Sequence, residues 1–182
     1  MNVIPTRLPG VVIIEPRIFR DARGYFLETW NQSRYEQAGL PSTFIQDNLS
    51  HSAPGVLRGL HLQVPNPQAK LVSVASGMIF DVAVDVRAGS STFGQWVGIT
   101  LDADDHSQLF VPAGFAHGFV VVKGPAKVSY KVDAPYSPKD EITILWNDPD
   151  LGIDWPVSVP TLSEKDQQGL RLRDLPADRL PR

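Results

Sequence analysis

The chain has 182 residues, a formal net charge of −3 and no cysteine. The lack of cysteine excludes disulfides and thiolate metal sites, and the slightly acidic balance argues against a protein that coats nucleic acid. The apolar runs are far shorter than the roughly 20 residues of a membrane-spanning helix, and the N-terminus lacks the apolar core of a signal peptide. We therefore expect one cytoplasmic domain over residues 1–182, with a flexible tail at 176–182 and no nucleic-acid or membrane partner.

Short runs rich in Val, Ile, Phe and Leu alternate with turns that contain most of the 14 Gly and 16 Pro residues. This pattern predicts an all-β sandwich or barrel rather than βαβ units. In chain order, the expected strands cover 11–19, 43–52, 56–63, 70–77, 78–87, 95–102, 107–114, 117–122, 126–133 and 141–148. Short helices are expected near 31–39, with Asn31 as N-cap, and near 163–170, with Ser163 as N-cap.

The stretch from Gly55 to Gly77 places polar residues within two expected strands. Its spacing resembles the first motif of the cupin proteins, and PAGFAH at 112–117 resembles the second. The resemblance implies a jelly-roll barrel with a pocket in its mouth. Where metal-binding cupins have a second His and a Glu, this chain has Gln63 and Lys70. Because an ammonium group repels a divalent cation, we expect no metal and a pocket that favours an anion.

Arg58, His61, Lys70 and His117 together suit the binding of an oxyanion while a neutral imidazole accepts a proton. Simple alternation places Arg58 and His61 on opposite faces of their strand. For both to reach one pocket the strand must bulge or twist, and Gly59 is where that costs least. An irregular strand at Gly59 is therefore a condition of this hypothesis.

Further segments occur between Phe19 and Asp166. In chain order they are FRDARGYFLETW, QDNLS, GVLRGLHLQ, KLVSVASGMIFDVAVDVR, PAGFAHGF, VSYK, YSPKDEI and LSEKD. Together they resemble the dTDP-4-dehydrorhamnose 3,5-epimerase family. The resemblance implies a homodimeric jelly roll that exchanges N-terminal strands and uses no metal or cofactor. The implied substrate is a dTDP-linked 4-keto-6-deoxy sugar, inverted at C3 and C5 on the route to dTDP-L-rhamnose.

The resemblance also implies roles for individual residues. His61 is the base, Asp166 orients it, and Tyr130 is the acid on the opposite face, while Lys70 stabilises the enolate oxygen. The implied substrate-binding positions are Arg23, Phe26, Glu28, Gln46, Asn48, Arg58, Lys70, His117, Glu141 and Lys165. The planar guanidinium groups of Arg23 and Arg58 suit the pyrophosphate, and Arg23 and Glu28 are expected to serve the neighbouring subunit's pocket.

Several residues have a second interpretation. Asp166 also fits a capping box with Ser163, and either Asp81 or Asp85 is an alternative partner for His61. Tyr130 alone fits a barrel-wall aromatic, and RGYF fits a plain turn. The chain departs from the family pattern at Leu62, which we expect to alter the core, and at Ser73, which we expect at the pocket rim.

Three other functions compete with a double epimerase. They are a single-carbon epimerase or keto-isomerase on a related deoxysugar, a metal-dependent cupin oxygenase or isomerase, and a non-catalytic sugar-nucleotide-binding module. The presence of both His61 and Tyr130 favours epimerisation, because inversion needs groups on two faces of the sugar.

Overall fold

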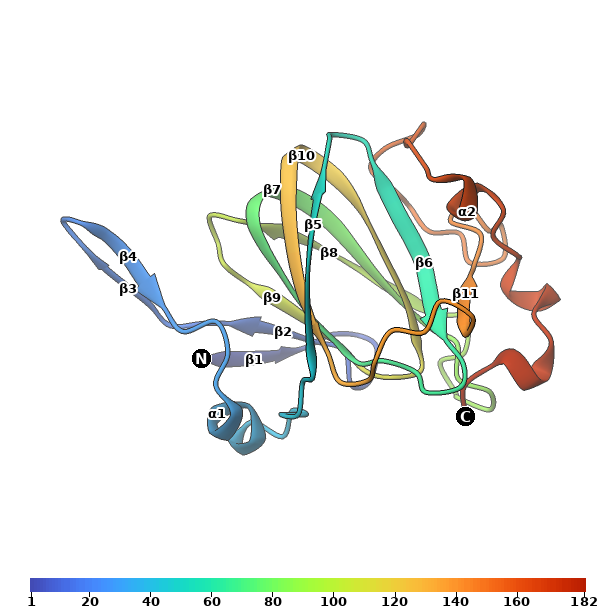
Figure 1. Ribbon diagram of the computed structural model, residues 1–182, viewed down its shortest axis with the longest axis horizontal. Helices are drawn as coiled ribbons and strands as arrows, with labels where there is room; N and C mark the ends of the chain where they lie inside the picture. Colours follow the sequence, from blue (N-terminus) through green and yellow to red (C-terminus); the bar gives the residue numbers. More distant parts are fainter.

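The protein is built almost entirely of β-strands in the computed structural model, which describes Met1 to Arg182 (Figure 1). The strands are β1 (Asn2–Pro5), β2 (Val12–Glu15), β3 (Ile18–Asp21), β4 (Gly24–Leu27), β5 (Gln46–Ser52), β6 (Leu57–Gln63), β7 (Lys70–Asp85), β8 (Trp96–Asp102), β9 (Gln108–Val111), β10 (Phe115–Val132) and β11 (Glu141–Thr143). The helices are α1 (Gln32–Gln37) and α2 (Glu164–Gln167), and short 3-10 turns cover Leu172–Asp174 and Ala177–Arg179. The expected all-β fold with two short helices is confirmed. The helix caps are also confirmed, since Asn31 accepts from the Arg34 amide and Ser163 from the Asp166 amide.

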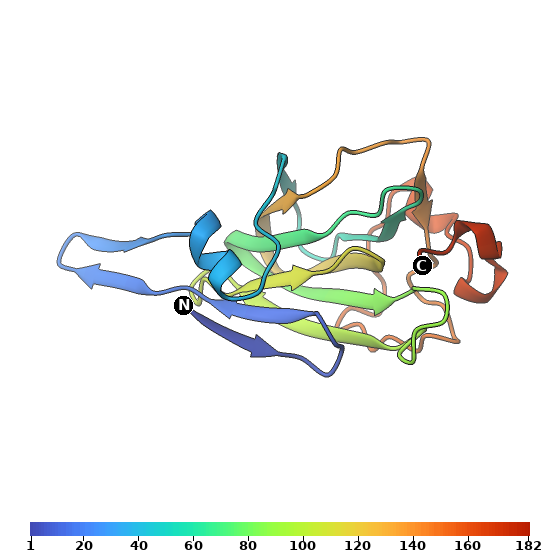
Figure 2. The same cartoon turned by 90° about the horizontal axis from the view of Figure 1, so that it is seen from below.

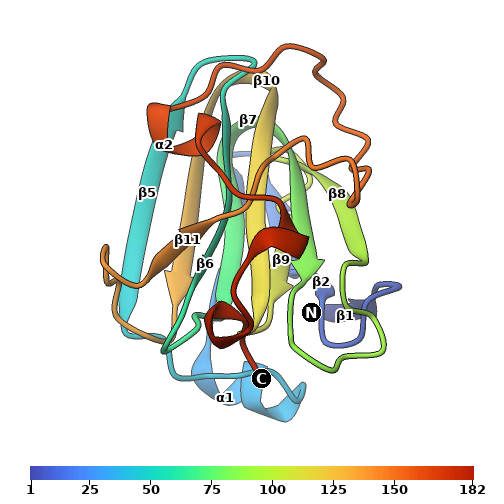
Figure 3. The same ribbon diagram turned by 90° about the vertical axis from the view of Figure 1, so that its right-hand side faces the viewer.

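Nine antiparallel strands form one sheet, which we call the sheet body. Its order is β1-β2-β9-β7-β10-β6-β11, with β5 also paired to β10 and β8 also paired to β7. Seen from the side in Figure 3, the C-terminal segment crosses in front of these strands. None of the helices has the length and apolar character that crossing a membrane requires.

Two long strands, β7 and β10, form the centre of the sheet body and pair along most of their length. The sequence predicted each of them as two strands separated by a turn near Gly77 or Gly124, and that division is wrong. The register instead shifts at several points between Val121 and Val128, so bulges take the place of turns. Gly77 has a φ of 79°, and a Cβ there would lie 2.5 Å from the Lys123 carbonyl oxygen, which explains the glycine.

The N-terminal region differs from the sequence prediction in two ways. Strand β1 was not predicted, and the single strand expected over 11–19 is interrupted at Pro16 and Arg17. Because proline has no amide hydrogen, it ends the pairing of β2. The chain then leaves the sheet body, and β3 and β4 form a separate hairpin that projects away from it (Figures 1 and 2). We call this hairpin, residues 18–27, the arm.

Three clusters of buried apolar side chains hold the sheet body together. The largest contains Phe115, Phe119 and Leu101, and the second contains Leu60, Leu62 and Ile144 on the side of the C-terminal segment. Full burial of each such side chain stabilises the fold by about 1.5–3 kcal/mol. The residues predicted as a flexible tail also contact the body: Leu180 packs against the second cluster, and the Ala88 amide donates to the Pro181 carbonyl at 2.7 Å. Their flexibility stays a prediction.

Candidate active site

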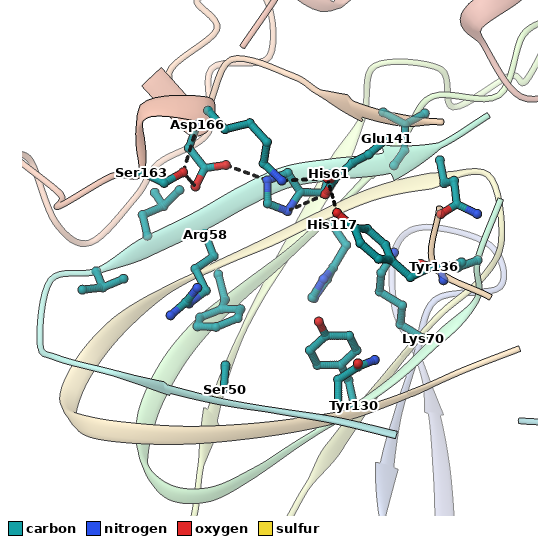
Figure 4. Close-up of a pocket in the computed structure, with 18 of the residues that line it drawn as sticks. Ser50, Arg58, His61, Lys70, His117, Tyr130, Tyr136, Glu141, Ser163 and Asp166 are labelled. Carbon is teal, nitrogen blue, oxygen red and sulfur yellow. Dashed lines mark hydrogen bonds and ion pairs between the residues drawn. The ribbon is translucent and has the colours of Figure 1, made fainter. Parts of the chain in front are cut away.

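A cavity of about 540 Å³ opens between β5, β6, β10, β11 and α2 (Figure 4). Its lining brings together ten of the residues predicted from the sequence: Gln46, Asn48, Arg58, His61, Lys70, His117, Tyr130, Glu141, Lys165 and Asp166. Six further polar residues line the cavity, and no binding or catalytic role was predicted for them from the sequence: Ser50, Gln63, Gln68, Tyr136, Thr161 and Ser163. Segments that lie far apart in the chain therefore meet in one polar pocket.

Strand β6 is irregular at the position where the sequence required it. Its partner β10 pairs His117 with His61 but Phe119 with Arg58, so the register shifts by one residue between these pairs. Gly59 lies inside this shift with a φ of 112°, and a Cβ on it would lie 2.7 Å from the Gly118 Cα. The predicted bulge is confirmed, and both Arg58 and His61 line the cavity.

His61 is held by a buried carboxylate from the C-terminal segment. Its Nε2 lies 2.6 Å from Oδ1 of Asp166, and the Ser163 hydroxyl donates to the other oxygen, Oδ2, at 2.7 Å. The Asp166 amide in turn donates to the Ser163 hydroxyl at 3.2 Å. Burial raises the pKa of Asp166, but the hydrogen bonds from His61 and Ser163 outweigh it and lower the pKa overall. The two interpretations of Asp166 therefore hold together, because it contacts both the imidazole and the helix cap.

The alternative carboxylates for His61 have other partners. Asp81 is fully buried and lies 2.7 Å from Nε2 of His117. Asp85 accepts hydrogen bonds from Arg87 and from two hydroxyl groups in the following loop. Neither residue contacts His61, so both alternatives are wrong.

A second carboxylate, Glu141, lies on the other side of the His61 ring. Its Oε1 is 3.7 Å from Nδ1 of His61, and its Oε2 accepts from the Tyr136 hydroxyl at 2.8 Å and from the Lys165 ammonium at 2.7 Å. Burial raises the pKa of Glu141, but the Lys165, His61 and Tyr136 contacts lower it overall. No role for Tyr136 was predicted from the sequence. Its place within YSPKDEI, one of the segments that resemble the family, was the signal that could have identified it.

Lys70 and Tyr130 lie across the cavity from His61 (Figure 4). Lys70 is 8% exposed, and burial lowers the pKa of its ammonium to about 8, against the attraction of Asp133, Asp81 and Glu141. Burial raises the pKa of the Tyr130 phenol, with a smaller opposing effect of Arg58. At neutral pH the cavity thus holds a charged lysine and a protonated phenol. This arrangement can stabilise a negative oxygen and can donate a proton.

A protein-family model described as dTDP-4-dehydrorhamnose 3,5-epimerase matches residues 5–174. The chain belongs to this family. Similar relatives include a Pseudomonas aeruginosa protein named dTDP-4-dehydrorhamnose 3,5-epimerase, 53% identical over 176 residues that cover 96% of this chain and 97% of the relative. An Escherichia coli protein of the same name is 48% identical over 96% of both chains. The chain is accordingly an isomerase, of the epimerase type.

Solved structures agree with this family. The Legionella pneumophila dTDP-6-deoxy-D-glucose-3,5-epimerase, in complex with dTDP-4-keto-L-rhamnose, gives a TM-score of 0.97 at 48% identity, covering 100% of this chain and 97% of the other. A double mutant of a 3'-monoepimerase from Streptomyces bikiniensis, in complex with dTDP, gives 0.90 at 34% identity, covering 98% and 92%. The likeness to epimerase structures over the whole chain confirms the predicted fold class.

Three residues that the family resemblance placed in the pocket do not line the cavity of their own chain. Arg23 lies at the tip of the arm, with its side chain 89% exposed and paired to Asp21. Phe26 is 70% exposed on the same hairpin. Glu28 accepts from Asn31 at 3.1 Å and forms an ion pair with Arg34. The arm points away from the sheet body (Figure 1), so these groups are separated from His61 within one chain.

The two departures from the epimerase family pattern have different positions. Leu62 is buried in the second apolar cluster and also borders the cavity. Ser73 does not line the cavity, so the expectation of a rim position is wrong. Its hydroxyl instead accepts from the buried amide of Gln108 at 2.9 Å.

Proposed function

We propose that the protein inverts C3 and C5 of dTDP-4-dehydro-6-deoxy-D-glucose and so forms dTDP-4-dehydro-L-rhamnose, for the synthesis of dTDP-L-rhamnose. One observation carries the proposal: a carboxylate-bound imidazole faces a protonated phenol across a cavity that contains a buried ammonium. The names of the relatives support the same reaction, as does the complex of the Legionella enzyme with dTDP-4-keto-L-rhamnose.

Proton removal is the role of His61. Asp166 binds one ring nitrogen and fixes the tautomer in which that nitrogen carries the hydrogen. The opposite nitrogen keeps its lone pair and accepts the proton from the carbon next to the 4-keto group. The C–H electrons then form the enolate, whose negative oxygen is stabilised by the Lys70 ammonium. Asp166 meanwhile stabilises the imidazolium that has formed.

Proton return is the role of Tyr130. Its hydroxyl proton passes to the same carbon from the opposite face, and the enolate electrons re-form the C–H bond. The imidazolium of His61 then releases its proton to water and the phenolate takes one from water, which restores both groups. The raised pKa of Tyr130 keeps the phenol protonated at neutral pH and so ready to act as the acid. Repeating the two steps at the second carbon completes the inversion, and no cofactor is needed.

Substrate binding requires more than one chain in this proposal. Gln46, Asn48, Arg58, His117, Glu141 and Lys165 contact the nucleotide and sugar from within the pocket. Arg23 and Phe26 on the arm, and Glu28 directly after it, reach the pocket from a second copy. The exposure of Arg23 and Phe26 in the single chain supports this arrangement. The protein then works as a homodimer with exchanged arms, each chain forming one domain over residues 1–182, in the cytoplasm.

The deciding experiment is incubation with the 4-keto sugar nucleotide in heavy water, followed by NMR. Deuterium at both C3 and C5 supports the proposal. The likeness to a 3'-monoepimerase favours a second candidate, a single-carbon epimerase, and deuterium at one carbon only supports that candidate. Binding of dTDP without exchange indicates a binding module, and loss of exchange with a chelator indicates a metal-dependent enzyme.

The exchange of arms is tested by mixing two chains with different defects. The variant His61→Asn keeps its arm but loses its base, and Arg23→Ala keeps its base but loses the arm guanidinium. After subunit exchange, the mixed dimer contains one pocket with both groups intact. Activity at low substrate concentration should rise above that of either variant alone. If it equals the average of the two, the arm does not serve a neighbouring pocket.

A further inference from the structure

The arm joins the sheet body through a linker, residues 28–31, between β4 and α1. The carbonyl oxygen of Thr29 in this linker accepts from the Gln108 side-chain amide at 2.8 Å and lies 3.1 Å from the Tyr35 hydroxyl. Gln108 begins β9 in the sheet body and is 2% exposed, and Tyr35 in α1 is 3% exposed. The root of the arm is thus held by the buried Gln108 amide, with the buried Tyr35 hydroxyl beside it.

Every hydrogen-bonding group of the Gln108 side chain is used in this contact. Its nitrogen donates to the Thr29 carbonyl and to the Ser73 hydroxyl, and its oxygen lies 2.5 Å from the Tyr35 hydroxyl. A primary amide has two N–H donors, so both are satisfied. Burial, together with the charge of Glu28, raises the pKa of Tyr35 to about 12, which leaves the phenol protonated and able to donate to Gln108. The amide is therefore oriented with its nitrogen toward the linker.

A second contact joins the arm itself to the same segment of the sheet body. The ring of Tyr25 in β4 lies against the ring of His106, with 4.5 Å between centroids. His106 precedes β9 by two positions, and the sequence analysis gave it no role. His106 thus contacts the arm at Tyr25, and Gln108 holds the linker at Thr29.

We propose that Gln108 is a positioning residue for substrate binding, because it fixes the direction of the arm and thereby places Arg23 in the pocket of a neighbouring copy. This inference rests on the proposed function, in which the arm serves a second chain. The six residue-to-residue steps from Arg23 to Thr29 span about 20 Å when extended, so a rotation of about 10° at Thr29 moves the tip by about 3 Å. A displacement of that size breaks a hydrogen bond. Loosening the root therefore weakens substrate binding and leaves His61 in place.

The first test compares two variants of the Gln108 contacts. Gln108→Leu keeps the side-chain volume but removes the bond to the linker, and we expect KM to rise about tenfold with kcat within about twofold of wild type. Ser73→Ala is the matched control, since it removes a hydrogen bond of the same amide on the side of the sheet body. It should leave KM unchanged. An equal rise in both variants would show that Gln108 only packs the sheet body, which overturns the inference.

A double-mutant cycle with Arg23→Ala tests whether Gln108 acts through the arm. When the guanidinium is already absent, Gln108→Leu should raise KM no further. If KM of the double variant instead rises by the product of the two single increases, the inference is overturned. If Gln108→Leu does not fold, Tyr35→Phe replaces it, because this change removes only the hydroxyl that orients the amide.

The direction of the arm is also measurable without activity. The chain has no cysteine, so spin labels attach cleanly at Ala22→Cys on the arm tip and Lys127→Cys on β10. In samples diluted with unlabelled chain, pulsed EPR should give a broader tip-to-body distance distribution for Gln108→Leu than for wild type or Ser73→Ala. An unchanged distribution overturns the inference even if the protein is not an epimerase. An inactive wild-type enzyme with a broadened distribution in Gln108→Leu would instead count against the proposed function alone.

Discussion

Several polar side chains of the pocket have partners within their own chain, whereas side chains on the arm are exposed to solvent. In the pocket, His61, Asp166 and Glu141 are bound to one another or to neighbours within the same chain. On the arm, Arg23 and Phe26 extend into solvent. The difference fits the proposed function, in which one chain supplies the acid–base groups and part of the binding site, and the arm of a second chain completes it.

This comparison predicts different kinetic effects for substitutions in the pocket and on the arm. Changes at His61, Tyr130 and Lys70 in the pocket should lower kcat, because they remove interactions with the reacting atoms. Changes on the arm should raise KM, because they remove binding energy remote from the reacting carbons. Each prediction below tests one side of that division.

The largest effect is expected for His61→Asn. Loss of the base should slow deuterium incorporation at C3 and C5 by roughly 10²- to 10⁴-fold, the usual contribution of general acid–base catalysis. NMR in heavy water measures it directly. His51→Asn is a suitable control, because His51 is an exposed histidine of β5 outside the cavity. Exchange at the wild-type rate in His61→Asn would show that another group is the base.

Tyr130→Phe should have the next largest effect. It keeps the packing of the ring but removes the proton donor, so net inversion should fall by roughly 10²-fold. Proton removal by His61 continues, and the imidazolium returns a proton to the face of the sugar from which it was taken. The ratio of isotope exchange to inversion should therefore increase, as measured by NMR on one sample. Equal losses of exchange and inversion would contradict the assignment of Tyr130 as the acid.

Arg23→Ala tests the arm. Hydrogen bonds to charged groups contribute about 1.5–3 kcal/mol, so KM should rise roughly ten- to hundredfold while kcat changes little. Steady-state kinetics provide both constants. Arg20→Ala is the control on the same hairpin, because no role in substrate binding is predicted for Arg20, whose guanidinium lies over the Tyr25 ring. A fall in kcat at unchanged KM would remove the contrast between arm and pocket.

The smallest effect is a pH dependence that originates in the pocket. Burial lowers the pKa of Lys70 to about 8, so the ammonium is present below that pH and is lost as the pH rises through it. We expect kcat/KM to fall above pH 8 for this reason. Lys70→Arg retains its charge to much higher pH, so its profile should lack this fall even though its maximum is lower. An identical alkaline fall in both proteins would assign it to another group.

The sequence predicted the pocket better than the arm, for a physical reason. Strands β6, β7 and β10 contain consecutive buried residues, so their apolar runs and the glycines between those runs are visible in the sequence. The arm buries neither face, and its aromatic residues Phe19, Tyr25 and Phe26 are all exposed. No alternation marks such a hairpin, and the segment RGYF fitted a plain turn as well as a binding segment.

Long-range contacts account for the remaining differences. Asp166 lies 105 residues from His61 in the chain, so spacing alone did not choose between it and the aspartates of β7. The anchor formed by Gln108, Tyr35 and Thr29 likewise joins three segments, and none of these residues carries a local signal. The bulges at Gly77 and Gly124 were predicted as turns, because glycine suits both structures.

The irregular middle of β10 has a consequence for where the Tyr130 side chain points. His117 and Phe119, at odd positions, line the cavity before the register shifts, and Tyr130, at an even position, lines it after them. A perfectly regular strand would send one of the two sets outward. The bulges thus change which residues of β10, odd-numbered or even-numbered, face the cavity. Deleting a single residue between 122 and 127 would therefore turn the phenol out of the cavity without unpairing the strands.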